Sequence, residues 1–80
     1  MSNPELKNLA SDILLNASDY IGNNPELFGA DNHALDTIKH NETFRKTISD
    51  EITDEPEEYE HLSQQECAQL VWRLYRKWAY

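Results

Sequence analysis

Apolar residues recur at helical spacing along most of this chain, and no segment shows the sustained alternation of apolar and polar residues that is typical of a half-buried β-strand. The pattern is clearest near the C-terminus, where Ser63 and Glu66 form a capping box. The apolar stripe that follows comprises Cys67, Leu70, Val71, Leu74, Tyr75 and Trp78. This pattern predicts an all-α fold with a well-defined final helix.

The N-terminal segment predicts a first helix that begins at Pro4, with Asn3 as its N-cap and Gly22 as its C-terminal stop. The apolar face of this helix comprises Leu6, Leu9, Ala10, Ile13, Leu14, Ala17, Tyr20 and Ile21. Leu15 is on the polar side of the helix. We therefore expect it either singly on the surface or in contact with another element.

The middle of the chain predicts three shorter segments. Residues 24–27 repeat the Asn-Pro-Glu-Leu sequence of residues 3–6, which indicates shared capping chemistry rather than a duplication, and Gly29 is expected to end this segment in a short turn. Residues 34–40 predict a helix, followed by a bend near His40 because the next apolar positions do not continue its angular pattern. Those positions, at strict fourfold spacing, are Phe44, Ile48 and Ile52.

The chain has 80 residues, which is enough for one domain, so we expect a single helical domain over residues 1–80. The expected architecture is a small bundle of about four helices, in which the first and last helices supply most of the core. Residues 53–60 form an acidic connector before the C-terminal helix, in which Pro56 ends the preceding helix and the glutamates are able to begin one short turn. A chain of this size buries only about 60% of its unfolded surface, which disfavours a strained catalytic centre.

The negative charge is concentrated in residues 50–60, which we call the acidic segment. The whole chain carries a formal charge of −8, yet these residues hold seven carboxylates and no basic residue. The expected partner-binding residues are Asp50, Glu51, Asp54, Glu55, Glu57, Glu58 and Glu60, with Tyr59 as an aromatic anchor. Three interpretations remain open: a solvated connector, internal pairing with the cations of the last helix, and docking onto a basic partner.

Aromatic residues are concentrated at the C-terminus, where Tyr75 and Trp78 are expected in the core. Trp72 and Tyr80 fit the apolar stripe less well, and aromatic residues flanked by arginine are common in protein interfaces. An alternative interface therefore comprises Trp72, Arg73, Arg76 and Tyr80, used either in a homodimer or with a helical partner.

Other functional classes find little support in the sequence. The candidate metal ligands His33, His40, His61 and Cys67 lack ligand-like spacing, so we expect neither a metal nor a cofactor. Cys67 lies on the apolar stripe, where burial makes a thiol unreactive, and no catalytic motif is present, so no enzyme is expected. Neither a secretory signal nor a membrane span is recognisable, which favours the cytoplasm.

These observations predict a non-catalytic acidic binding protein that docks the acidic segment onto a basic, nucleic-acid-binding protein and inhibits or regulates it. Small phage and mobile-element inhibitors, such as anti-CRISPR and anti-restriction proteins, and nuclease immunity proteins resemble this chain in size and charge. The alternative is a structural or regulatory subunit that associates through its aromatic C-terminal helix. Direct nucleic-acid binding is not expected from so acidic a chain, although the last helix carries three cations.

Overall fold

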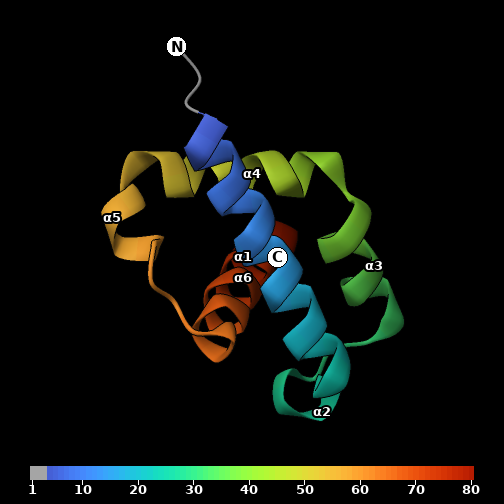
Figure 1. Cartoon of the computed structure of the whole chain (residues 1–80). Coiled ribbons are helices and arrows are strands. Elements are labelled where there is room, and N and C mark those ends of the chain that lie inside the picture. Colours follow the sequence, from blue (N-terminus) through green and yellow to red (C-terminus); the bar gives the residue numbers. More distant parts are fainter. Residues whose placement is uncertain (1–3) are drawn as a thin grey trace.

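Two long helices, α1 (Pro4–Asn23) and α6 (Gln64–Ala79), pack across each other, and the shorter helices surround this pair (Figure 1). The structure, a computed structural model, describes residues 4–80 and the side chains from residue 9 onward. These residues form six helices and no strand. The remaining four are α2 (Pro25–Phe28), α3 (Asn32–His40), α4 (Glu42–Asp54) and α5 (Pro56–Tyr59). The predicted all-α class is confirmed.

Helix α1 begins at Pro4 as predicted, whereas the expected N-cap Asn3 lies outside the described residues. The prediction that Gly22 ends this helix is wrong, because Gly22 is helical and α1 continues to Asn23. Gly22 does not adopt the left-handed conformation of a glycine cap.

Asn24 ends α1 and does not cap α2. Its backbone N–H and its side-chain Nδ2 both donate to the Tyr20 carbonyl, each at 3.0 Å, and its side chain makes no capping bond to α2. The side-chain amide therefore adds a second hydrogen bond to a carbonyl in the last turn of α1. The expected N-capping role of this residue, by analogy with residues 3–6, is wrong.

Acidic and amide side chains cap the two helices of the middle region. Asp31 Oδ1 accepts from the Ala34 N–H at 2.8 Å at the start of α3. Asn41 Oδ1 accepts from the Phe44 N–H at 3.0 Å at the start of α4. Asn41 itself is extended, with φ −78° and ψ 115°. The predicted bend near His40 is thus confirmed.

The core lies between the facing sides of α1, α3, α4 and α6. As the fourfold spacing predicted, Phe44, Ile48 and Ile52 are fully buried. Helices α1 and α6 supply most of the other buried apolar residues, which are Ala10, Ile13, Leu14, Ala17, Ile21, Cys67, Ala68, Leu70, Val71, Leu74 and Tyr75, while α3 contributes Ala34 and Ile38. Leu15 is 68% exposed, which agrees with its place on the polar side of α1.

Helix α6 begins with the predicted capping box. Ser63 Oγ accepts from the Glu66 N–H at 3.2 Å, and Glu66 Oε1 accepts from the Ser63 N–H at 3.0 Å. The Gln64 side chain also donates to Asp19 Oδ2 at 3.0 Å and so joins the start of α6 to α1. The expectation that Trp78 belongs to the core is wrong. Its side chain is 37% exposed because it lies in the last turn of α6, beyond the buried part of the helix.

Candidate functional site

The acidic segment covers the C-terminal end of α4, all of α5 and the turn that follows (Figure 1). Asp50, Glu51 and Asp54 belong to α4, which therefore extends into the connector predicted over residues 53–60, and the helical turn allowed for there is α5. Ile52 on the same helix is buried, and the α-helical period therefore places Asp50 and Asp54 toward solvent. Helix α5 contains no buried residue.

The carboxylates of the acidic segment have no cationic side chain in contact. Six of them are exposed and only Glu51 is half-buried. Among residues 9–80, no Lys or Arg nitrogen lies within 4.0 Å of an Asp or Glu oxygen, and the single pair found at this limit joins His61 Nε2 to Glu60 Oε2 at 4.0 Å. The expected alternative, ion pairing with the cations of α6, is therefore absent from this part of the chain.

Four of these carboxylates are close enough to influence one another. A side-chain hydrogen bond with Glu58 and repulsion by its charge raise the pKa of Glu55, and smaller contributions come from burial and from the charges of Glu51 and Asp54. Glu66 has the opposite surroundings, because the backbone N–H and hydroxyl of Ser63 lower its pKa. The acidic segment is thus a place where negative charges repel one another within the fold.

Tyr59 is held against the core and does not project from the acidic segment. Its side chain is half-buried and packs against the core, and its hydroxyl donates to Glu51 Oε1 at 3.5 Å. Burial raises the pKa of Tyr59, as do the charges of Glu51, Glu58 and Glu55, whereas the charge of Arg73 lowers it. Arg73 is therefore the cation of α6 that approaches the acidic segment.

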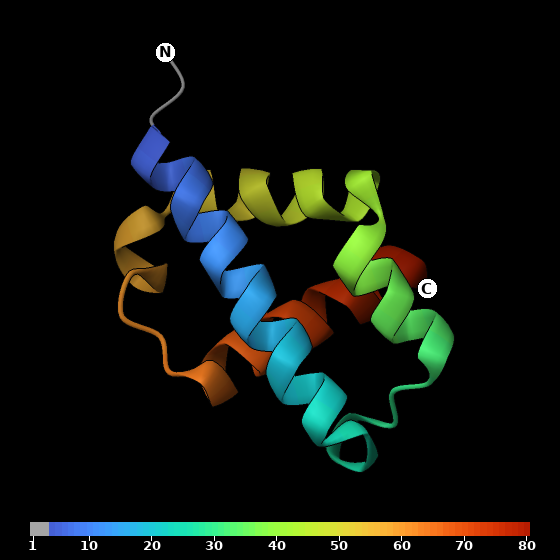
Figure 2. The same ribbon diagram turned by 45° about the vertical axis from the view of Figure 1, so that its right-hand side comes forward.

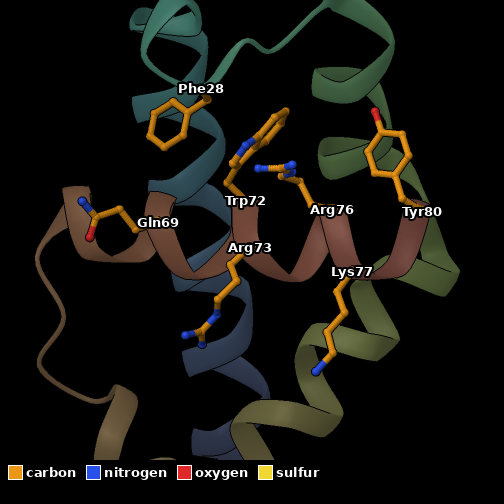
Figure 3. A pocket seen from close by; sticks show the side chains of 7 residues that line it. All are labelled: Phe28, Gln69, Trp72, Arg73, Arg76, Lys77 and Tyr80. Carbon is orange, nitrogen blue, oxygen red and sulfur yellow. The ribbon is translucent and has the colours of Figure 1, made fainter.

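A second surface feature is a shallow groove of about 530 Å³ along the exposed side of α6, which we call the aromatic groove (Figure 3). Its lining residues are Phe28, Gln69, Trp72, Arg73, Arg76, Lys77 and Tyr80. Trp72, Arg76 and Tyr80 follow one another at four-residue spacing and extend toward the side of Phe28. Arg73 and Lys77 extend to the opposite side of α6 in this view. The groove thus combines aromatic rings with three exposed cations.

A series of ring contacts supports the aromatic groove from below. The rings of Trp72 and Tyr75 stack with centroids 5.2 Å apart, and Phe28 meets Trp72 edge-on at 5.9 Å. Tyr75 is 6% exposed and belongs to the core. Tyr80, by contrast, is 93% exposed. The groove therefore has a fixed floor at Trp72 and an uncovered ring at its C-terminal end.

The alternative interface predicted from the sequence coincides with this groove. Trp72, Arg73, Arg76 and Tyr80 all line it. Gln69 and Lys77 were not among the residues predicted for this interface. Their four-residue spacing from Arg73 places all three side by side on a helix and could have indicated them. Phe28 was also missed, and no local signal was available for it, because α2 is a single turn without an apolar stripe.

The thiol of Cys67 is enclosed in the core, and the side chains able to ligate a metal are not clustered among residues 9–80. Cys67 is 2% exposed, and burial raises the pKa of its thiol. Within residues 9–80, no group of three or more His, Cys, Asp or Glu side chains is arranged to hold a metal ion. In the same residues, every helix is too short or too polar to span a bilayer.

Comparison of the chain with protein-family models, curated proteins and solved structures gave no match.

Proposed function

We propose that this chain is a non-catalytic acidic binding protein whose acidic segment docks onto the basic surface of a nucleic-acid-binding protein and inhibits or regulates it. The observation that carries the proposal is the set of seven carboxylates without a Lys or Arg contact among residues 9–80. At Glu55 the fold opposes the charge, because a hydrogen bond with Glu58 and the charges of neighbouring carboxylates raise its pKa. A basic partner would relieve this repulsion.

Electrostatics also explains how such a surface selects its partner. Clustered carboxylates present negative charge much as nucleic-acid phosphates do, so they attract a groove lined with Lys and Arg and accelerate association. The rest of the chain is nearly neutral, with a formal charge of −1 outside residues 50–60. Attraction is therefore directed to one part of the molecule. Inhibitors of the anti-CRISPR or anti-restriction type are the class of protein that this size and charge suit.

A second candidate function is favoured by the aromatic groove. A structural or regulatory subunit would use Trp72, Arg76 and Tyr80 to associate with a helical partner or as a homodimer, since exposed aromatic and arginine side chains dominate interface energies. In that case Trp72→Ala dissociates the complex and the carboxylates of the acidic segment contribute little. Complex formation is then nearly independent of salt.

The test compares two amide variants of the whole chain, each with four carboxylates removed. The acidic-segment variant carries Asp54→Asn, Glu55→Gln, Glu57→Gln and Glu58→Gln. The carboxylate control carries Asp12→Asn, Glu26→Gln, Asp36→Asn and Glu42→Gln, all exposed positions outside the segment. Glu51 is left unchanged because it accepts the Tyr59 hydroxyl. The two variants have the same net charge.

Partners captured from a lysate of the source organism are washed with increasing salt and then purified. We expect the wild-type chain and the carboxylate control to retain the partner and to displace nucleic acid from it, whereas the acidic-segment variant does neither. Equal retention by both variants would contradict the proposal. Loss of retention with Trp72→Ala alone would favour the second candidate.

A further inference from the structure

The three cations of the aromatic groove have no anionic side chain in contact with them in the described part of the chain. Arg73, Arg76 and Lys77 are exposed, and none lies within 4.0 Å of an Asp or Glu oxygen among residues 9–80. They flank Trp72 and the almost fully exposed Tyr80. A surface of this composition fits an anionic protein segment, whose carboxylates would pair with the cations while the segment covers the aromatic rings.

The same chain carries such a segment, but within one molecule none of its carboxylates lies within 4.0 Å of the groove cations. Helix α5 and the C-terminal end of α6 lie on opposite sides of the molecule (Figure 2), whose longest dimension is 38 Å. Only Arg73, nearer the middle of α6, is close enough for its charge to lower the pKa of Tyr59. Arg76 and Lys77 lie farther along the helix, toward its C-terminal end.

We infer that the aromatic groove binds the acidic segment of a second copy of this chain, in a head-to-tail contact. The two surfaces are complementary in charge, and neither has a Lys–carboxylate or Arg–carboxylate contact in residues 9–80. The inference goes beyond the proposed function, because it requires no external partner. In the self-associated state the acidic segment is covered, so a basic partner competes with self-association.

The net charge of −8 does not prevent this contact at physiological salt. Exposed charges are screened over about 8 Å in 0.15 M salt, so the facing surfaces dominate over the charge of the whole molecule. Those facing surfaces have opposite signs, since the acidic segment holds seven carboxylates and the groove three cations. Apolar contact with Tyr80 and the exposed part of Trp72 adds a contribution that salt does not screen.

A head-to-tail contact has a recognisable signature, because the two joined surfaces are different. In a pair joined in this way, one copy has a free groove and the other has a free acidic segment. Further copies can therefore add at both ends, which gives an open series unless the rotation between neighbouring copies closes a ring. A dimer formed by two equivalent aromatic helices is closed instead. The two arrangements therefore differ both in size distribution and in their response to salt.

The experiment uses sedimentation velocity over a range of protein concentrations at about 0.1 M and about 1 M salt, where the Debye length is about 10 Å and about 3 Å. We expect concentration-dependent oligomers at the lower salt and mainly monomer at the higher. A monomer under all conditions would overturn the inference. A salt-independent dimer that the acidic-segment variant also forms would overturn it as well, and would favour association between aromatic helices.

Two variants that each lack the charges of one surface provide the decisive test. The groove variant carries Arg73→Gln, Arg76→Gln and Lys77→Gln, and its matched control carries Lys39→Gln, Arg45→Gln and Lys46→Gln, which are exposed cations outside the groove. We expect the groove variant and the acidic-segment variant each to be monomeric, while both controls still associate. Mixed together, the two monomeric variants should form a closed one-to-one complex, because each retains the surface that the other lacks.

Complex formation in the mixture also shows that both variants are folded, so monomeric behaviour of either one is not a folding failure. No complex in the mixture, with both variants folded by circular dichroism, would overturn the head-to-tail contact. This outcome is separate from the capture experiment, which measures binding to an external partner. The two experiments can thus show partner binding without self-association, or self-association without partner binding.

Discussion

The aromatic groove and the acidic segment lie on the same small molecule but depend on the core to different degrees. The groove is built on rings that continue into the interior, since Trp72 stacks on the buried Tyr75. The acidic segment is built on the end of α4 and on a four-residue helix without a buried residue. Removing the Trp72 ring should therefore affect folding and binding together, whereas removing exposed carboxylates of the acidic segment should affect binding much more than folding.

Glu66 and Glu55 show that the fold can also treat two single carboxylates differently. The backbone N–H of Ser63 donates to the Glu66 carboxylate, and this bond, together with the nearby Ser63 hydroxyl, lowers the pKa of Glu66. Glu55 has carboxylate neighbours, and its pKa is raised. The ionised form is stabilised by the fold at Glu66 and opposed by it at Glu55. Charge at Glu66 thus supports a helix start, while charge at Glu55 needs an explanation outside the fold.

The largest expected effect is that of Phe44→Ala, which removes the ring on which the aromatic cluster rests. Phe44 is fully buried, with its ring 5.8 Å from Tyr75 and 5.4 Å from Trp78. We expect the free energy of unfolding to fall by about 3–5 kcal/mol, against about 0.5–1.5 kcal/mol for Ile48→Val as a milder control. Urea unfolding followed by circular dichroism measures both. A loss below about 1 kcal/mol for Phe44→Ala would show that the groove does not rest on a tightly packed core.

Trp72→Ala and Tyr80→Ala separate the floor of the groove from its uncovered end. Trp72 contacts Phe28 and Tyr75, so we expect its loss to lower the free energy of unfolding by about 1–3 kcal/mol. Tyr80 is 93% exposed, and its replacement should stay within about 0.5 kcal/mol of wild type. Thermal unfolding of the two variants tests this difference. Equal destabilisation would mean that Tyr80 packs more closely than its exposure indicates.

Ser63→Ala should have a smaller effect, because it removes one cap of α6 without opening a cavity. We expect a loss of about 1 kcal/mol. The partner glutamate adds a pH signature. The pKa of Glu66 is lowered, so its contribution is present above its unfolded value of about 4.3 and is lost as the pH falls through the folded value. Urea unfolding of wild type and Glu66→Gln should therefore differ at neutral pH and converge in acid.

The helices and their buried faces were largely predictable from the sequence, because both follow from local capping chemistry and apolar period. The Ser63–Glu66 box and the spacing of Phe44, Ile48 and Ile52 each act over a few residues, and the structure confirms them. One error arose where two elements compete for the same side chain. Asn24 was predicted to start α2, but the end of α1 takes its amide.

The candidate site was less predictable, because its features depend on contacts between distant segments. Four of the groove residues were identified on α6, yet Phe28 reaches the groove from α2 through the packing of the chain. Nothing in the residues around Phe28 signals that contact. The charge of residues 50–60 was visible at once, whereas the absence of an ion pair with α6 follows only from the three-dimensional arrangement.

The acidic-segment variant should show the smallest effect on stability. The direction of its change in unfolding temperature tests whether these carboxylates contribute to the fold. The pKa of Glu55 is raised from 4.5 by its neighbours, so the repulsion that the variant removes is absent below the unfolded pKa and develops as the pH rises through the folded one. At neutral pH and low salt we therefore expect the variant to unfold at a slightly higher temperature than wild type. The difference should disappear at about pH 3 and shrink in high salt.

Calorimetric unfolding at two pH values and two salt concentrations measures this difference, with the carboxylate control alongside. The control removes the same number of charges from positions outside the acidic segment. Two of these, Glu26 and Glu42, lie in the first turns of α2 and α4, as Glu57 and Glu58 lie in the first turn of α5, so the control accounts for net charge and for charge at helix starts. If the acidic-segment variant were less stable than this control, the carboxylates of the acidic segment would contribute to the fold. That result would contradict the proposed difference between the acidic segment and the aromatic groove. A variant that is at least as stable but fails to bind separates the two properties: the carboxylates would then be needed for binding and not for folding.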